Sequence, residues 1–267
     1  MSLVHTRLTG GVLTVTLDDE AKRNALSGRL VGELSQALDA ADTDPDVRVV
    51  VLTNTGKVFC AGADLSERSS GSDGPAAVRS PQDLFGRFAR SPKPYVGRIA
   101  GHCIAGGMGL AAAMDISVAV DDAMFGFTEV RVGVAPAVIS VVCLPKLRSS
   151  DARAAILRGR RFPASEAARM GLINSAVPPD RLDAEIDAVV TDLLAGGPGA
   201  IAASKRLLSE VPGTPVAEAF RWTADLSAQL FASDEATEGM RAFLEKRPAA
   251  WVRPPPPASG QEEARGG

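Results

Sequence analysis

The segment VRVVVLT, residues 47–53, constrains the fold of this chain more than any other stretch. It is almost continuously apolar and rich in β-branched residues, so both faces of the strand that it predicts must be buried. Such strands belong to parallel sheets that helices cover on both sides. Residues 27–41 carry leucines at helical spacing, and residues 12–17 alternate apolar and hydroxyl side chains as a strand does. This alternation of strands and helices predicts an α/β core.

The remaining pattern divides the chain into regions. The α/β pattern continues through a helix near 81–90, a strand near 95–100, a helix at 106–113 and a strand at 115–120. Between them, the serine- and glycine-rich residues 65–80 predict a mobile loop. From residue 149 the segments have helical spacing. We expect a core over residues 1–195, a helical C-terminal region over 196–250 and a disordered tail over 251–267.

Composition excludes several classes of protein. The 267 residues are 45% hydrophobic, which is enough to fill a core. A net charge of −3 provides no basic surface for nucleic acid. No apolar run reaches the roughly 18 residues that span a bilayer. The N-terminal segment has no apolar signal core, so we expect a cytoplasmic protein that does not insert into a membrane.

Few cysteines and histidines are present. Cys60, Cys103 and Cys143 form no CxxC pair and lie beside no ligand-spaced histidines, so we expect no metal site. We expect buried, reduced thiols, with a nucleophilic Cys60 or Cys103 as the less favoured alternative. His5 falls in a strand-like segment and His102 in a loop. Acid–base chemistry is therefore expected to fall to carboxylates.

Two glycine clusters stand where chemistry is expected. FCAGADL, residues 59–65, and IAGGMG, residues 104–109, each follow a predicted strand and precede a predicted helix. The first turn of a helix presents unpaired N–H groups, and glycine lets a ligand approach them closely. Two such turns side by side form an oxyanion hole worth about 3–4 kcal/mol per donor. The alternative is that the glycines only serve tight turns and close packing. Neither cluster matches a nucleotide-binding loop.

Glu129 is the strongest candidate for proton transfer. It lies in FGFTEVRV, between Phe125, Phe127, Val130 and Val132. Apolar surroundings raise the pKa of a carboxyl and suit it to proton transfer near neutral pH. The alternative is a glutamate on an exposed loop. Two other carboxylates are weaker candidates, because Asp64 is placed to cap a helix and Asp115 to start a strand.

Taken together, these segments resemble the enoyl-CoA hydratase/isomerase, or crotonase, family. The resemblance runs in order through RNALS (23–27), FCAGADL, AGHCIAGGMGLAAAMDI, FGFTEVRVGVAPA, GRRFPASEAARMGLI (159–173) and EGMRAFLEKRP (238–248). It implies a spiral core of ββα repeats followed by a helical region that mediates trimer formation. Such trimers often pair into hexamers, so a homotrimer or a homohexamer is expected.

The resemblance also implies roles for individual residues. The N–H groups of Ala63 and Gly106 would hold the thioester carbonyl of an acyl-CoA substrate, and Glu129 would be the catalytic carboxylate. The residues expected to contact the substrate are Arg23, Ala25, Ala61, Gly62, Asp64, Leu65, Gly107, Phe243 and Lys246. No separate cofactor is implied, because coenzyme A is part of the substrate.

The sequence departs from the family at one catalytic position. Typical enoyl-CoA hydratases carry two glutamates, and Gly109 stands at the first position while Glu129 stands at the second. A hydratase is the favoured prediction, because the run EVRVGVAPAVIS resembles hydratases that act on branched glutaconyl-CoA substrates. His102 or Arg131 could then assist, although a structural or surface role is the favoured prediction for each of them. An isomerase needs only one base and is the first alternative. A non-catalytic acyl-CoA-binding protein is the second.

Overall fold

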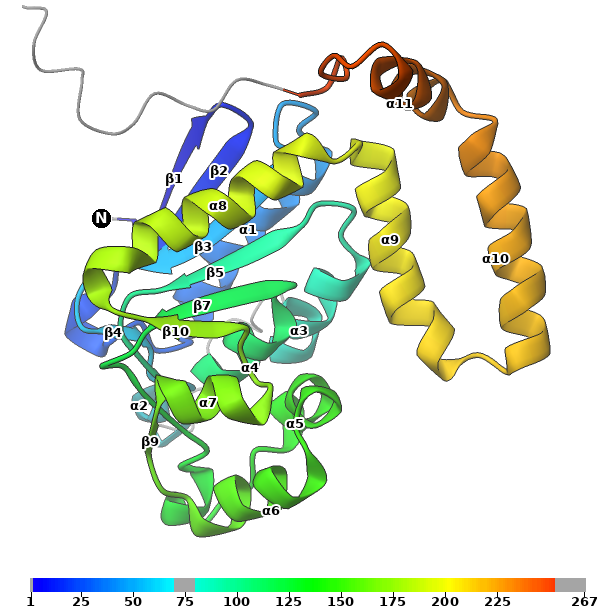
Figure 1. Ribbon diagram of the computed structural model, residues 1–267. Coiled ribbons are helices and arrows are strands. Elements are labelled where there is room, and N and C mark those ends of the chain that lie inside the picture. Colours follow the sequence, from blue (N-terminus) through cyan, green and yellow to red (C-terminus); the bar gives the residue numbers. More distant parts are fainter. Residues whose placement is uncertain (1, 70–79, 253–267) are drawn as a thin grey trace, which may run out of the picture.

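The computed structural model describes residues 2–69 and 80–252 (Figure 1). Within these residues the strands form a six-stranded sheet of order β1-β2-β3-β5-β7-β10 and a four-stranded sheet of order β4-β6-β8-β9. The large sheet contains β1 Val4–Thr9, β2 Val12–Leu17, β3 Val49–Asn54, β5 Tyr95–Ile99, β7 Ile116–Val120 and β10 Ser175–Val177. The small sheet contains β4 Val58–Cys60, β6 His102–Ile104, β8 Met124–Gly126 and β9 Phe162–Pro163.

Helices connect and cover the strands. The α-helices are α1 Gly28–Thr43, α2 Leu65–Ser69, α3 Pro81–Arg90, α4 Gly106–Ala113, α5 Ala137–Cys143, α6 Ser149–Arg158, α7 Ala164–Met170, α8 Leu182–Ala195, α9 Pro198–Glu210, α10 Val216–Phe231 and α11 Asp234–Leu244. The 3-10 helices are η1 Glu20–Lys22, η2 Glu129–Val132, η3 Leu144–Lys146, η4 Pro179–Arg181 and η5 Val211–Gly213. The helices predicted at 81–90 and 106–113 are confirmed with those bounds.

The large sheet confirms the predicted α/β class. β1 and β2 form an antiparallel hairpin, and the pairs from β2 through β3, β5 and β7 to β10 are parallel. Every residue of β3 is buried, as its unbroken apolar sequence predicts. In Figure 1, α8 crosses one face of this sheet and α1 lies behind it. The predicted loop at 65–80 begins with α2, and residues 70–79 lie outside the described residues.

The small sheet positions the two glycine clusters. β4 pairs in parallel with β6, which places Cys60 opposite Cys103. The turns that follow these two strands therefore lie side by side. His102, predicted in a loop, instead begins β6, and its Nδ1 accepts a hydrogen bond from the N–H of Met124 at 3.0 Å. The prediction was wrong because strands of three residues are too short to show a period.

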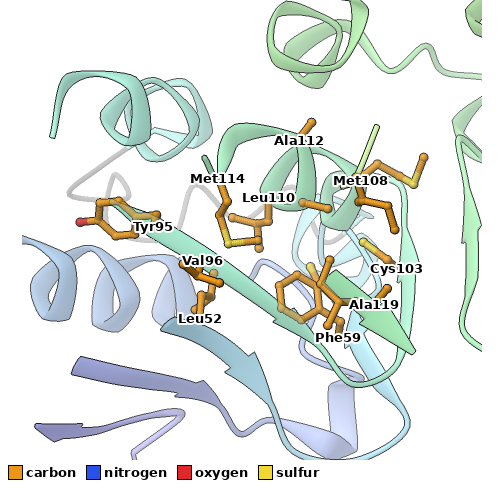
Figure 2. Close-up of a cluster of buried hydrophobic side chains, with 14 of the residues drawn as sticks. Leu52, Phe59, Tyr95, Val96, Cys103, Met108, Leu110, Ala112, Met114 and Ala119 are labelled. Atoms are coloured by element: carbon orange, nitrogen blue, oxygen red, sulfur yellow. The ribbon is translucent and has the colours of Figure 1, made fainter. Parts of the chain in front are cut away.

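Helix α4 is the centre of the core. Its buried residues include Met108, Leu110 and Ala111, and its apolar character on every side suits full burial. Figure 2 shows Leu110 and Met114 pointing toward Val96 and Leu52 of the large sheet. The helix is thereby held along its length, which fixes the position of its N-terminal turn.

Helices α9, α10 and α11 form a C-terminal arm beside the core (Figure 1). Helix α10 has no buried residue, although it carries exposed apolar side chains such as Phe220 and Phe231. The indole N–H of Trp251, after α11, donates to Ala195 O at 3.0 Å. Residues 253–267 of the predicted tail lie outside the described residues. In the described part of the chain, no single helix is long and apolar enough to span a membrane. The segments 179–195 and 198–213 reach the required length and hydropathy only when taken together, and the chain bends by 106° between them.

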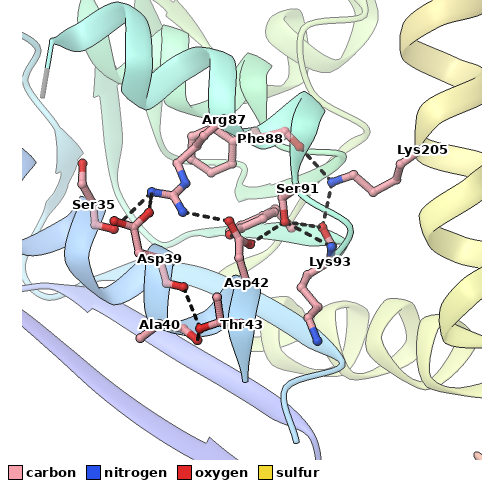
Figure 3. Close-up of polar contacts among 11 residues, drawn as sticks. Ser35, Asp39, Ala40, Asp42, Thr43, Arg87, Phe88, Ser91, Lys93 and Lys205 are labelled. Carbon is pink, nitrogen blue, oxygen red and sulfur yellow. Dashed lines mark hydrogen bonds and ion pairs between the residues drawn. The ribbon is translucent and has the colours of Figure 1, made fainter. Parts of the chain in front are cut away.

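A buried lysine attaches the arm to the core (Figure 3). The ammonium of Lys205 on α9 donates to Phe88 O at 2.9 Å, to Lys93 O at 2.7 Å and to the Asp115 carboxylate at 2.7 Å. Only 7% of the Lys205 side chain is exposed, and burial lowers its pKa. Asp115 was predicted to start a strand, but β7 begins one residue later, and the carboxylate also accepts a hydrogen bond from the N–H of Tyr95.

A buried arginine fastens α3 to α1 in the same region. The guanidinium of Arg87 donates to Ser35 O at 3.1 Å and pairs with Asp42 at 2.8 Å and Asp39 at 2.9 Å. Asp42 also accepts hydrogen bonds from the hydroxyls of Ser91 and Tyr95 (Figure 3). Helix α3 is therefore fixed to α1 at its C-terminal half.

Candidate active site

The two glycine turns meet at the carboxyl ends of β4 and β6. Gly62 has a φ of +90°, and a Cβ built on it would lie 2.7 Å from the Cβ of Ala105 and 2.9 Å from the backbone nitrogen of Gly106. Only glycine fits both the conformation and the space. A Cβ on Gly106 would in turn lie 3.1 Å from the Cα of Gly62. The backbones of the two turns are therefore in direct contact.

Each turn presents a backbone donor. Gly106 is the first residue of α4, and Ala105 before it provides no side-chain cap. Among the hydrogen bonds of residues 2–69 and 80–252, no acceptor pairs with the N–H of Ala63 or of Gly106. Ala63 directly follows Gly62, whose backbone contacts Gly106, so the N–H groups of Ala63 and Gly106 belong to adjoining backbone segments. Ala105 has a φ of +50°, a strained value for a non-glycine residue that marks functional sites in general.

The RNALS segment supports the first turn through its backbone. Ala61 N donates to Arg23 O at 3.1 Å, and Leu26 N donates to Gly62 O at 2.7 Å. Ala25 is 7% exposed, which leaves its side chain little surface for a ligand. The Arg23 side chain is exposed, as the prediction of a coenzyme A contact requires.

Asn24 is a residue that the sequence analysis missed. It is fully buried with a φ of +51°, a conformation that asparagine tolerates better than most residues. Its Oδ1 accepts from Asp19 N at 2.7 Å, and its Nδ2 donates to Val58 O at 2.8 Å and Thr55 O at 3.3 Å. These bonds join the RNALS turn to the segment around β4. The sequence signal that could have identified Asn24 is its place between Arg23 and the apolar pair Ala25 and Leu26.

Asp64 is held as an ion and is not free for catalysis. Its carboxylate pairs with the Lys22 ammonium at 2.7 Å, and it accepts from the N–H of Ser66 at 2.9 Å. These bonds, Lys22 first, lower the pKa of Asp64 to about 2. The bond to Ser66 caps the start of α2, so the predicted capping role is confirmed. Leu65 beside it is 59% exposed at the start of α2.

Glu129 is the first residue of η2, and its carboxyl is half-buried. Its Oε2 atom is buried and has no hydrogen-bond partner within the described residues. Burial raises the pKa of this carboxyl. Burial and then the Glu129 charge raise the pKa of the Cys143 thiol on α5 to about 12. The flanking Val130 and Val132 were expected to supply the apolar surroundings, but both are exposed.

The position of Gly109 is closed to any side chain. A Cβ built on Gly109 would lie 2.5 Å from Cγ2 of Ile139 on α5 and 2.9 Å from Cε1 of Phe85 on α3. Both side chains are 4% exposed. The space that a side chain at 109 needs is therefore filled by hydrocarbon, which the sequence alone did not reveal.

Three predicted contact residues lie elsewhere or serve packing. A Cβ on Gly107 would lie 2.4 Å from Cys60 O, so this glycine lets α4 approach β4. Phe243, 82% exposed, lies in the last turn of α11, and Lys246 follows the end of that helix; Figure 1 places α11 away from α2 and α4. Within one chain the structure does not bring them to the site. Their separation follows from the arm, whose direction no local pattern predicts.

Burial makes the three cysteines unsuited to nucleophilic chemistry. Burial raises the pKa of the thiols of Cys60 and Cys143 to about 12 and that of Cys103 well above its usual value. Such thiols stay protonated, which disfavours a nucleophilic role. Across residues 2–69 and 80–252, no group of three or more histidine, cysteine or acidic side chains is arranged to hold a metal ion.

The sequence profile of the family described as Enoyl-CoA hydratase/isomerase matches residues 7–254. The chain belongs to this family. It is 38% identical over 244 residues to a Thermus thermophilus protein provisionally named enoyl-CoA hydratase, across 90% of this chain and 96% of that relative. It is 32% identical over 256 residues to the carnitinyl-CoA dehydratase of Escherichia coli K12, across 93% and 97%.

Solved structures of the enoyl-CoA hydratase/isomerase family share the fold. The crystal structure of an enoyl-CoA hydratase from Mycobacterium smegmatis matches with a TM-score of 0.88 and 32% identity, over 94% of this chain and 99% of that one. The predicted crotonase-type fold is thereby confirmed. Residue roles inferred from the resemblance, including those of Ala63, Gly106 and Glu129, stay predictions.

Proposed function

We propose that this chain is an enoyl-CoA hydratase-like lyase that adds water across the C2–C3 double bond of an acyl-CoA thioester. The observation that carries the proposal is the meeting of the glycine turns, where the N–H groups of Ala63 and Gly106 have no acceptor within the described residues. Two such donors stabilise the negative charge that develops on a thioester oxygen, by about 3–4 kcal/mol each. The enoyl-CoA hydratase and carnitinyl-CoA dehydratase names of relatives support the same chemistry.

Glu129 supplies the proton transfers. Its carboxylate accepts a proton from water while the hydroxide oxygen bonds to C3 and the C2–C3 π electrons move onto the thioester oxygen. The resulting enolate is held by the two N–H groups. Glu129 then returns the proton to C2, so one carboxylate completes the addition without a net change. Its unpartnered Oε2 and raised pKa suit this double role. The scheme uses no separate cofactor.

The alternative function is an enoyl-CoA isomerase. The closed position at Gly109 favours it, because this position holds no second carboxylate. Glu129 would take a proton from C2 of a 3-enoyl thioester and deliver it to C4 while the double bond moves to C2–C3. The same oxyanion hole would serve both reactions. A non-catalytic acyl-CoA-binding role is the remaining alternative, and the unpartnered Oε2 atom of the half-buried Glu129 carboxyl argues against it.

Assembly into a homotrimer or homohexamer forms part of the proposal. Helix α10 buries none of its residues within one chain although it carries the exposed side chains of Phe220 and Phe231, and contiguous exposed apolar surface is typical of interfaces. We also propose a cytoplasmic location.

The ultraviolet absorbance of the conjugated enoyl thioester distinguishes the three functions. Crotonyl-CoA, 3-methylglutaconyl-CoA and a 3-enoyl-CoA are supplied separately to the purified protein. Loss of absorbance with either of the first two supports the hydratase. A gain with the third alone supports the isomerase and contradicts the hydratase. No change with any of them, together with measurable acyl-CoA binding, contradicts both enzymes.

A further inference from the structure

Ile139 and Phe85 occupy a place beside the proposed reaction centre. Gly109 lies one helical turn after Gly106, the residue that begins α4. Because Cα–Cβ bonds tilt toward the N-terminus of a helix, a side chain at 109 would lean toward the turn that carries the Gly106 N–H. The atoms found there instead are Cγ2 of Ile139, 2.5 Å from a Cβ built at 109, and Cε1 of Phe85 at 2.9 Å.

The helix that carries Ile139 packs on α4 and follows Glu129 closely in the chain. Ile139 and Cys143 are one turn apart on α5, and both are buried. The thiol of Cys143 donates to Met108 O on α4 at 3.6 Å, so the face of α5 that Ile139 shares borders α4. The N–H of Val134, three residues before α5, donates to Glu129 O at 3.2 Å, which ties the start of this segment to η2. An acyl chain that ran from the Gly106 turn along α4 toward α5 would meet hydrocarbon here.

We infer that Ile139 and Phe85 form a wall that determines specificity and restricts this chain to short acyl groups. The inference rests on the proposed acyl-CoA chemistry and names its substrate class. Both side chains are 96% buried against their neighbours, and α3 is fastened by Arg87. A rigid apolar wall discriminates by roughly 10-fold or more for each methylene that it excludes.

Binding of saturated acyl-CoA thioesters tests the wall without requiring turnover. The affinities of butyryl-CoA and octanoyl-CoA are measured by calorimetry for the wild type, Ile139→Ala, Phe85→Leu and Val141→Ala. Val141 is the matched control, because it lies on the same helix but is 75% exposed. The ratio of the two Kd values within one preparation does not depend on the fraction that is folded, so destabilised variants remain informative.

We expect the wild type to prefer butyryl-CoA. Ile139→Ala and Phe85→Leu should each shift the ratio toward octanoyl-CoA, by roughly 10-fold for the alanine variant, and Val141→Ala should leave it unchanged. An unshifted ratio in both wall variants, or a wild type that binds both thioesters equally, overturns the inference. Enoyl-CoA turnover is measured in parallel. If the protein turns over enoyl-CoA but the ratio of Kd values does not shift in the wall variants, the wall is contradicted and the proposed function stands. If the ratio shifts but the protein shows no turnover, the wall stands and the proposed function is contradicted.

Discussion

Replacing Gly109 with alanine tests the packing that closes the second carboxylate position. The new Cβ would lie 2.5 Å from Ile139 Cγ2 and 2.9 Å from Phe85 Cε1, whereas ordinary contacts are 3.4–4 Å. Alanine gains about 1 kcal/mol over glycine in a helix interior, and overpacking a core costs about 1–3 kcal/mol. The net change is therefore a loss of about 0–2 kcal/mol in the free energy of unfolding.

Gly32→Ala is the matched control. Gly32 lies inside α1, and a Cβ built on it has no heavy atom within 4 Å. This variant should gain about 1 kcal/mol, so the two alanine variants should differ by about 1–3 kcal/mol. Urea unfolding followed by circular dichroism at one protein concentration measures both.

A double-mutant cycle locates the cause of the loss. Ile139→Ala removes the Cγ2 atom that Gly109→Ala would strike, so the second alanine should cost less in that background. We expect a coupling of about 0.5–3 kcal/mol. If Gly109→Ala is as stabilising as Gly32→Ala, or if the cycle shows no coupling, the closed position is refuted.

Three further predictions concern the site and its supports. Burial raises the pKa of Glu129 above its usual 4.5, so the ionised base is lost as pH falls through that raised value. The acidic limb of the kcat/KM profile should therefore lie above pH 4.5, and it should disappear in Glu129→Gln. Lys205→Met leaves the Asp115 carboxylate without its ammonium partner and should cost about 3–5 kcal/mol, measured by urea unfolding, whereas a cost near zero would contradict the buried pair. Asn24→Ala leaves Val58 O unpaired and places alanine at positive φ, so it should cost about 2–4 kcal/mol and slow turnover; unchanged unfolding would contradict this.

Sequence predicts the large sheet of this fold better than the small one. The run at 47–53 is apolar on both faces and appears as the fully buried β3. The small sheet has strands of three residues or fewer, which carry no detectable period, so the sequence places His102 in a loop although it begins β6. Its pairings depend on contacts distant in sequence, such as that between Cys60 and Cys103.

The candidate site was predictable where backbone geometry decides it. Glycines at 62 and 106 indicate close approach of two turns, and the structure brings those turns into contact. What fills the space beside Gly109 comes from α3 and α5, and no local pattern shows that Phe85 and Ile139 meet there. The direction of the C-terminal arm, which sets where Phe243 lies, is likewise a matter of tertiary packing.

The most direct test of the central claim is turnover of enoyl-CoA substrates by Glu129→Gln beside acyl-CoA binding. Glutamine keeps the size of the side chain and removes its ability to accept a proton. The account predicts that turnover falls by roughly 100-fold or more while butyryl-CoA binds as in the wild type. Near wild-type turnover in this variant would contradict the role of Glu129 and with it the proposed mechanism.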